Sequence, residues 1–295
     1  MKRIGNLYQQ ICSLENLHLA DMRARDNKKG QKGIVQHDKN REANIVDLRQ
    51  RLLNKTYQTS PYKTFVIHDP KERVISCLPY IDRIVHHAIM NVLEPIFVAT
   101  FTGFTYSCIK GRGIHAASKA VKKALKNENE TRYCLKLDIR KFYPSVDRCI
   151  LKNLLRRKFK DADLLWLLDG IIDSSEGLPI GNYISSYFAN FYLCFLDHYI
   201  KEVLRVKHVF RYADDFVILS DNKKRLHEIL KSINQYLQQK LKLTLKPNYQ
   251  IFPVSARGID FVGYKHFHTH TLIRTEIKKR FARKLKKGAG QAVIA

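Results

Sequence analysis

Three aspartates in two short apolar segments are the residues of this sequence best suited to do chemistry. Asp214 and Asp215 stand side by side in the segment VFRYADDFVIL, which predicts two short strands that fold back at residues 212–215. Adjacent carboxylates repel each other, and apolar neighbours lower the local dielectric, so a proton or a bound divalent cation must offset the pair. A polar hairpin turn, in which aspartate is simply a common turn residue, is the alternative.

A second segment favours the catalytic interpretation. Residues 133–137, which read YCLKL, predict a strand that ends on Asp138. A strand that delivers one carboxylate beside a hairpin that presents two more assembles a site made of oxygen ligands alone. Such hard ligands favour magnesium or manganese over zinc. The prediction depends on Asp138 lying close to the tip of the hairpin.

Positive charge dominates the rest of the chain. Lys and Arg number 53 against 27 Asp and Glu, so the formal net charge is +26. Basic residues occur along the whole length, for example at 28–29, 156–158 and 278–280, which suits a long positive channel better than one basic tail. A polyanion is therefore the expected partner, bound less tightly as salt rises. A basic protein without such a partner would not explain the acidic cluster.

The remaining composition narrows the class of protein. The chain has 295 residues, 45% of them hydrophobic, and this length suits one large or two to three smaller subdomains. Its 6 cysteines lack the C-x-x-C spacing of zinc knuckles, so neither zinc nor a disulfide framework is expected. No segment approaches the ~18 apolar residues of a membrane span, and no signal peptide is evident. We expect a cytoplasmic protein without a membrane partner.

Hydrophobic periodicity predicts an α+β fold. Around the aspartates the order is strand, helices, hairpin, helix, strand, which is the βαββαβ pattern of a ferredoxin-like sheet with helices on one face. Helices are expected over 45–53, 83–93 (stopped before Pro95), 114–126, 147–158, 163–172, 184–203, 224–240 and 277–287. Paired strands are expected within 62–78 and around 255–258. The alternating His266, His268 and His270 are expected on one solvated strand face rather than in a metal site.

Several segments, taken together, resemble reverse transcriptases of the bacterial retroelement branch. In the order of that family they are KERVI (71–75), DRIVHH (82–87), LDIRKFY (137–143), LPIGN (178–182), YADD (212–215) and GIDFVGY (258–264). The resemblance implies a right-hand polymerase fold with a ferredoxin-like palm, helical and hairpin fingers and a short basic C-terminal thumb. The implied domains are 1–133 for an N-terminal extension and fingers, 134–265 for the palm with a fingers insertion at about 147–183, and 266–295 for the thumb and tail.

One position is similar to a particular subfamily. Most family members place Gln-Gly where this chain has Ile180-Gly181, and an aliphatic residue there resembles the reverse transcriptases of diversity-generating retroelements. Those enzymes copy a template RNA with frequent errors at adenines. The N-terminal segments KRIGNL and ENL are similar as well. The chain departs from the subfamily at Ser186, where Gln is usual, and at Asn248, where a lysine is usual and for which Lys246 is the candidate replacement.

The resemblance implies a role for each matching residue. Asp138 and Asp214 would ligate two Mg²⁺ ions, replaceable by Mn²⁺, with help from the backbone carbonyl of Ile139 and with Asp215 as a weaker ligand. These three aspartates would be the catalytic residues. The implied nucleotide-binding residues are Lys71, Arg73, Tyr143, Ile180 and Gly181. The implied primer-binding and template-binding residues are Arg112, Tyr212, Gly263, Tyr264, Lys278, Lys279 and Arg280. Ordinary packing for Tyr143 and Ile180, and an exposed basic hairpin for Lys71, are the alternatives.

The implied function is RNA-directed DNA polymerisation by two-metal nucleotidyl transfer. The implied partners are a template RNA, the RNA/cDNA duplex and deoxynucleoside triphosphates. Because only about 30 residues follow Tyr264, a small basic accessory protein oligomer is also expected. A group II intron-like or defence-associated reverse transcriptase is an alternative. A catalytically silent RNA-binding protein on a polymerase scaffold is another, against which the intact aspartates argue.

Overall fold

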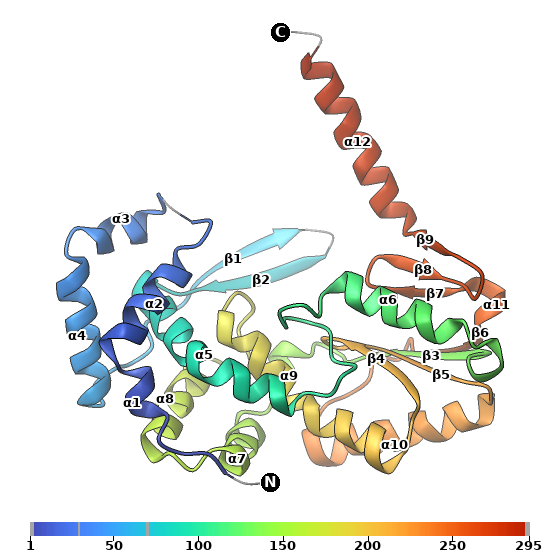
Figure 1. Ribbon diagram of the computed structural model, residues 1–295, viewed down its shortest axis with the longest axis horizontal. Coiled ribbons are helices and arrows are strands. Elements are labelled where there is room, and N and C mark those ends of the chain that lie inside the picture. Colours follow the sequence, from blue (N-terminus) through green and yellow to red (C-terminus); the bar gives the residue numbers. More distant parts are fainter. Residues whose placement is uncertain (1–2, 29, 69–70, 293–295) are drawn as a thin grey trace. The chain divides into compact units, whose positions relative to one another are not determined.

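The computed structural model describes residues 3–28, 30–68 and 71–292, with side chains described as far as residue 285. The chain forms two compact units (Figure 1). Unit 1 comprises Met1–Phe101, Lys141–Phe195 and Lys240–Leu243, and unit 2 comprises Thr102–Arg140, Leu196–Gln239 and Thr244–Ala295. The segments of each unit are far apart in the sequence, so both depend on long-range packing.

A four-stranded antiparallel sheet is the centre of unit 2. Its strands are β3 (Tyr133–Asp138), β4 (His208–Tyr212), β5 (Asp215–Ser220) and β6 (Gln250–Pro253), and their order in the sheet is β4-β5-β3-β6. Helix α10 (Lys223–Leu241) connects β5 to β6. In chain order, the first and third of these strands are therefore the central ones. This is the order of a ferredoxin-like βαββαβ sheet, and the predicted α+β fold is confirmed.

Alternation along the strands gives the sheet two apolar faces. Cys134, Val217 and Leu219 are buried on one face, together with Ala117 and Val121 of helix α6 (Ile114–Leu125). The residues between them in the strands, such as Leu135 and Ile218, point to the other face and are also fully buried. Figure 1 shows α10 on the opposite side of this sheet from α6. The sequence pattern did not predict that α6 covers the second face.

A smaller sheet follows in the same unit and corrects two predictions. Residues 254–257 form the short helix α11 (Val254–Arg257), so β6 and β7 (Ile259–Phe261) belong to different sheets instead of pairing around 255–258. Strand β7 pairs with β8 (Tyr264–His266), which pairs with β9 (Thr271–Ile273). Because β8 ends at His266 and the amide of Phe267 donates to the carbonyl of His270, the expected single strand face for the three histidines is wrong. Helix α12 (Thr275–Ala292) ends the described chain.

Unit 1 consists of helices and one hairpin. The hairpin pairs β1 (Lys63–His68) with β2 (Glu72–Cys77). The helices are α1 (Tyr8–Ile11), α2 (Leu14–Ala24), α3 (Lys32–Asp38), α4 (Arg41–Leu53), α5 (Tyr80–Thr100), α7 (Arg148–Lys158), α8 (Ala162–Asp173) and α9 (Tyr183–His198), the last of which runs into unit 2. The side chains of Asp147 and Asp161 accept amide hydrogen bonds at the starts of α7 and α8, which fixes where both helices begin.

Helix α5 runs through Pro95, so the prediction that it stops before this residue is wrong. Proline lacks the amide that would bond the preceding turn and costs ~3 kcal/mol in a helix interior. Leu93 and Phe97 on either side are fully buried. The burial of two such side chains contributes an amount of the same size, which explains why the helix continues.

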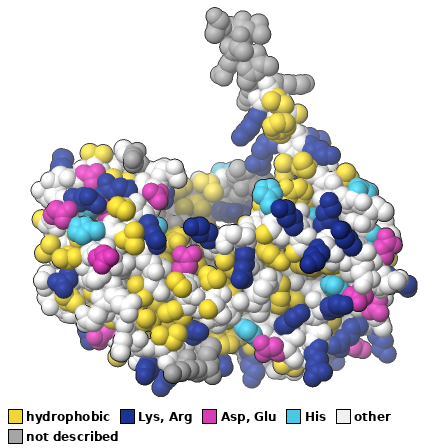
Figure 2. Space-filling model, in the orientation of Figure 1, with side chains coloured by type: hydrophobic (Ala, Val, Ile, Leu, Met, Phe, Trp, Pro, Cys, Tyr) yellow, Lys and Arg dark blue, Asp and Glu magenta, His cyan; other side chains and the backbone are white. Residues whose placement is uncertain are grey.

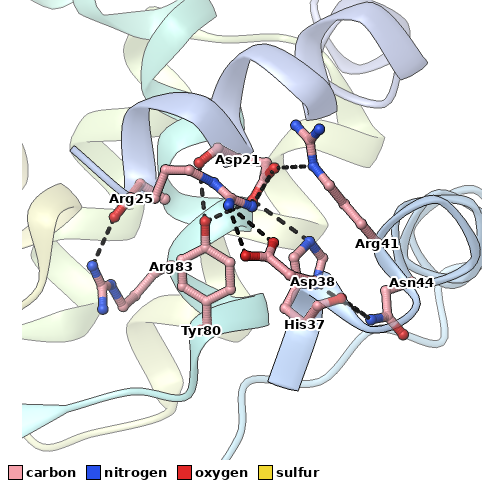
Figure 3. A network of polar contacts seen from close by, with 9 residues as sticks. Asp21, Arg25, His37, Asp38, Arg41, Asn44, Tyr80 and Arg83 are labelled. Atoms are coloured by element: carbon pink, nitrogen blue, oxygen red, sulfur yellow. Dashed lines mark hydrogen bonds and ion pairs between the residues drawn. The ribbon is translucent and has the colours of Figure 1, made fainter. Parts of the chain in front are cut away.

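A buried polar network ties four helices of unit 1 together (Figure 3). The carboxylate of Asp21 in α2 is fully buried and accepts hydrogen bonds from Arg25 at 2.7 and 2.8 Å and from Arg41 of α4 at 2.7 Å. The hydroxyl of Tyr80 in α5 donates to it at 2.6 Å. His37 of α3 lies 3.5 Å away. Although burial alone would raise the pKa of Asp21, the hydrogen bonds from Tyr80, Arg25 and Arg41 hold it below its usual range.

Among the described residues, no helix has the length and apolar character needed to cross a membrane. Lys and Arg side chains are instead spread over both units on the face shown in Figure 2. This distribution matches the basic composition along the whole sequence.

Candidate active site

Strand pairing in unit 2 brings the predicted aspartates together. In the register of β3 with β5, Asp138 lies directly opposite Asp215, which places their Cβ atoms ~5 Å apart. Tyr212 pairs with Asp215 across the β4–β5 hairpin, so Ala213 and Asp214 form its two-residue turn. Ala213 has a φ of 55°, a strained value for a residue with a side chain. The condition that Asp138 lie beside the hairpin tip is met.

Main-chain hydrogen bonds hold Asp138 and Asp214 at neighbouring positions. The amide of Ile139 donates to the carbonyl of Asp214 at 3.3 Å. On the other side of β3, the amide of Lys246 donates to the carbonyl of Asp138 at 2.9 Å, and its ammonium reaches the Oδ2 atom of Asp138 at 2.6 Å. Lys246 therefore belongs to the site.

The electrostatics of the site are those of crowded carboxylates. Burial, and next the charge of Asp138, raises the pKa of Asp214 to about 6. Burial also raises the pKa of Asp215, although Lys136 acts in the opposite direction. The negative charges at these ends of strands β3 and β5 are therefore costly unless a cation offsets them.

Lys136 is a site residue that the sequence analysis missed. Its ammonium lies 3.1 Å from Oδ2 of Asp215 and also donates to the carbonyl of Asp260 in β7. Side chains two apart in a strand share a face, so Lys136 points to the same side as Asp138. This alternation was the available signal. The contacts of Lys136 link Asp215 in the large sheet to β7 in the small sheet.

The donor atoms suit a hard divalent cation. The Oδ1 atoms of Asp138 and Asp215 are both buried and without a hydrogen-bond partner, while lysines hold the Oδ2 atoms. Buried carboxylate oxygens without partners are costly, and a cation would satisfy them. Within the part of the chain that the structure describes, no three His, Cys, Asp or Glu side chains are already gathered around one point. The oxygen donors thus fit magnesium, but the lysine contacts would have to loosen.

The predicted nucleotide-binding residues all lie in unit 1. Lys71 and Arg73 are exposed at the β1–β2 hairpin. The amide of Ser76 in β2 donates to the carbonyl of Ile180 at 2.7 Å. Gly181 has a φ of 119°, and a Cβ atom there would lie 2.6 Å from the carbonyl oxygen of Ser76. Only glycine therefore fits at this position against strand β2. The hydrogen bond from Ser76 fixes the main chain of Ile180 and so orients its half-buried side chain.

Tyr143 is anchored to the same connection. The amide of Leu178 donates to the carbonyl of Tyr143 at 2.8 Å, and Gly177, with a φ of 64°, approaches Pro144 too closely for any side chain. The ring of Tyr143 is half-buried against Phe142, with ring centroids 5.7 Å apart. Residues 177–181 therefore join Tyr143, Ile180 and strand β2 through their main chains.

The predicted primer-binding and template-binding residues lie in unit 2. Gly263 and Val262 both have positive φ in the turn between β7 and β8, and the carbonyl of Gly263 accepts from the amide of Arg274 at 3.0 Å. The Tyr264 hydroxyl lies 3.0 Å from Nδ1 of His115. Arg112 donates to the carbonyl of Thr102, and Tyr212 packs beside the apolar core. Lys278, Lys279 and Arg280 are exposed on α12.

A family model described as "Reverse transcriptase (RNA-dependent DNA polymerase)" matches residues 61–266, most of the chain and all three aspartates. The chain belongs to the reverse transcriptase family. This membership confirms the family-level resemblance, while the diversity-generating subfamily stays a prediction.

Two curated bacterial relatives support the assignment. Protein YkfC of Escherichia coli (strain K12) is 28% identical over 265 residues, which cover 74% of this chain and 70% of that protein. The group II intron-encoded protein LtrA of Lactococcus lactis subsp. cremoris is 21% identical, over 76% of this chain and 49% of that protein. The reverse transcriptase chain thus spans about half the length of LtrA.

Solved structures agree on the fold. Apo telomerase from Candida tropicalis superposes with a TM-score of 0.56 at 14% identity, over 73% of this chain and 49% of that chain. Telomerase from Candida albicans, in complex with a fragment of telomeric RNA, gives a TM-score of 0.54 at 11% identity, over 75% of this chain and 48% of that chain. At these identities the likeness supports the right-hand polymerase fold alone.

Proposed function

We propose that this reverse transcriptase chain is an active RNA-directed DNA polymerase. The observation that carries the proposal is the pairing of Asp138 with the Asp214-Asp215 turn at the ends of the two central strands. Two buried carboxylate oxygens there have no hydrogen-bond partner and could bind a cation. A catalytically silent RNA-binding scaffold would not need to maintain costly carboxylates at this position.

The catalytic roles are assigned to residues of unit 2. Two Mg²⁺ ions, or Mn²⁺, would activate the primer 3′-hydroxyl and offset the charge that develops on the α-phosphate. Asp138 and Asp214 would hold these ions, with help from the carbonyl of Ile139 and with Asp215 as a weaker ligand. Lys136 orients Asp215 through its ion pair. The chemistry is then mostly positioning of the primer end against the nucleotide.

The nucleotide is bound by side chains of unit 1. Arg73 suits the triphosphate because its planar guanidinium matches phosphate oxygens, and Lys71 adds charge. Tyr143 stacks under the sugar and excludes a 2′-hydroxyl. Gly181 allows close approach of the main chain, and Ile180 borders the new base pair. Arg112, Tyr212, Gly263, Tyr264 and the basic residues of α12 hold the primer and the template.

Primer extension on an RNA template tests the proposed function. The purified chain with magnesium and deoxynucleotides is expected to extend an annealed DNA primer, with or without an accessory protein. Absence of extension under both conditions, from protein that binds the primer–template, would favour the silent scaffold.

We also propose that the enzyme belongs to a diversity-generating retroelement. The support is Ile180, whose side chain cannot make the hydrogen bonds that a glutamine amide offers. A small basic accessory protein oligomer and a structured template RNA would then be its partners. Similarity to the group II intron-encoded LtrA favours the second candidate, a group II intron-like enzyme. Sequencing cDNA made by the purified protein separates the two, because errors concentrated at template adenines are expected only for the first.

Replacing Ile180 by Gln is expected to lower misincorporation opposite template adenine about fivefold, the effect of ~1 kcal/mol of added discrimination from a new hydrogen bond. The main chain at this position is anchored to Ser76, so the substitution changes the side chain alone. Deep sequencing of cDNA gives the error spectrum. Ile180→Leu is the matched control and should keep the wild-type spectrum. An unchanged spectrum in the Gln variant contradicts a role for Ile180 in fidelity.

Replacing Lys246 by Met is expected to slow single-nucleotide incorporation at least about a hundredfold, because we assign its ammonium, 2.6 Å from Oδ2 of Asp138, as the group that would protonate the leaving pyrophosphate. Single-turnover kinetics measure the rate. Lys246→Arg retains a cation beside Asp138 but is a much weaker acid, so it should bind Mn²⁺ normally by electron paramagnetic resonance and still be slow. Lys242→Met, four residues upstream in an exposed ion pair with Asp147, should be unaffected. A fast Lys246→Met variant excludes the proton-donor role.

A further inference from the structure

A tyrosine at the start of α9 presents a partly exposed ring in unit 1. Tyr183 follows Ile180-Gly181-Asn182 and is 40% exposed. Its ring stacks on the imidazole of His87 in α5, with ring centroids 4.4 Å and planes 8° apart. Tyr187, one turn further along α9, contacts the Tyr183 ring at 5.7 Å and donates its hydroxyl to Glu94 at 2.8 Å. The Tyr183 ring is therefore held in a defined plane while much of it reaches solvent.

Three positive charges act on this stacked pair. Burial first, and then the charges of Lys28, Arg83 and Arg23, lower the pKa of His87 to about 4, and Asp26 acts in the opposite direction. The imidazole is therefore neutral at neutral pH and offers an aromatic surface. The cations come from α2, from the loop that follows it and from α5. Separate segments of the chain thus gather positive charge around one pair of rings.

Two of these cations are held in place by neutral partners. Arg83 donates to the carbonyl of Ala24 at 2.8 Å and to the side-chain oxygen of Gln31 at 3.2 Å. Arg23 donates to the side-chain oxygen of Asn91 at 2.5 Å. Neutral acceptors fix the guanidinium groups but do not neutralise them. Lys28 is exposed as a residue, but partial burial of its ammonium, and next the charge of Arg83, lower its pKa. An anion placed here would offset this repulsion.

We propose that Tyr183 stacks an unpaired nucleotide of the template strand, whose phosphate contacts Lys28 and Arg83. An exposed ring beside positive charge is the arrangement by which proteins bind single strands, because every unpaired base has a face to stack while a paired base does not. A duplex, whose base faces are already stacked on one another, would not use the ring in this way. The inference rests on the proposed polymerase function only in identifying the bound strand as the template. Binding of a single strand is independent of catalysis.

Binding of a short labelled single-stranded RNA, measured by fluorescence anisotropy without magnesium or nucleotides, tests the site. Tyr183→Ala is expected to bind roughly tenfold more weakly, and Tyr183→Phe to bind as the wild type does. Lys28→Gln should reduce the salt dependence of log K by about one phosphate contact. The matched control is Tyr236→Ala, because Tyr236 of α10 also stacks on a ring, that of Tyr199, at 4.7 Å. Its affinity should be unchanged.

A 2-aminopurine base in the RNA reports stacking directly. Its fluorescence should be quenched on binding to wild type and to Tyr183→Phe, but not on binding to Tyr183→Ala. The circular dichroism spectrum of Tyr183→Ala should match that of the wild type, which shows that the variant is folded. The same loss with single-stranded DNA shows that base and phosphate suffice, and a loss with RNA alone shows that the 2′-hydroxyl contributes. Unchanged affinity and quenching in Tyr183→Ala, or equal weakening with a fully paired duplex, overturns the proposal. A wild type that stacks RNA but never extends a primer overturns the polymerase function instead.

Discussion

Asp214→Asn should lower primer extension about a thousandfold or more while single-stranded RNA is still bound. An amide in the hairpin turn cannot replace the charge that Asp214 would bring to a cation shared with Asp138. Metal-ion stabilisation of the transition state supplies several kcal/mol, and each ~1.4 kcal/mol is a factor of ten in rate. Single-turnover incorporation measures the loss, and binding of Mn²⁺ by electron paramagnetic resonance should weaken in parallel.

The same variant should be more stable than the wild type when no divalent cation is present. The pKa of Asp214 is about 6 in the folded protein, above the ~3.9 of an unfolded aspartate. The folded state therefore resists ionisation, and stability falls as pH rises from about 4 to about 6. Asparagine removes this cost, so at pH 7 we expect a gain on the order of 1 kcal/mol that disappears towards pH 4. Thermal unfolding at both pH values checks this sign.

Asp221→Asn is the matched control for Asp214→Asn, because Asp221 is exposed just beyond the far end of β5. It should leave both polymerisation and stability unchanged. Polymerisation at a near-normal rate by clean Asp214→Asn protein would remove the two-metal mechanism from this site.

The local patterns predicted the parts of the palm that are encoded locally. An apolar run that ends on Asp138 and a hairpin that turns at Ala213-Asp214 both depend on residues adjacent in sequence. Their convergence was a hypothesis built on these two patterns, and the register that sets Asp138 opposite Asp215 came from the structure. A one-residue slip in that register would have sent Asp215 to the other face.

The features that sequence reasoning missed depend on residues distant in the chain. Helix α5 continues through Pro95 because Leu93 and Phe97 are buried by other segments. The ion pair of Lys136 needs both β5 and β7 in place. The Asp21 network needs side chains from four helices, none of which carries a sequence signal by itself. Propensity describes neighbours in sequence, whereas these contacts arise from tertiary packing.

Replacing Asp21 by Asn should destabilise unit 1 by ~3–5 kcal/mol, the cost of breaking a buried ion pair from one side. The amide would present hydrogens to the guanidinium groups of Arg25 and Arg41, which already donate to this position. Urea denaturation followed by fluorescence suits the measurement, because the chain has 1 tryptophan and it is Trp166, in α8 of unit 1. The urea midpoint of unit 1 should fall, while the pairing of Asp138 with the Asp214-Asp215 turn in unit 2 should be kept.

Asp38→Asn provides the matched control, because Asp38 pairs with the same Arg25 at 2.9 Å but its side chain is 43% exposed. An exposed pair contributes ~1 kcal/mol or less, so Asp38→Asn should be nearly neutral. The depressed pKa of Asp21 means that its contribution is present above the ordinary aspartate pKa and is lost as pH falls through the lower folded value. The difference between wild type and Asp21→Asn should therefore shrink in acid below about pH 4. Equal effects of the two substitutions would show that burial of Asp21 does not govern the stability of these helices.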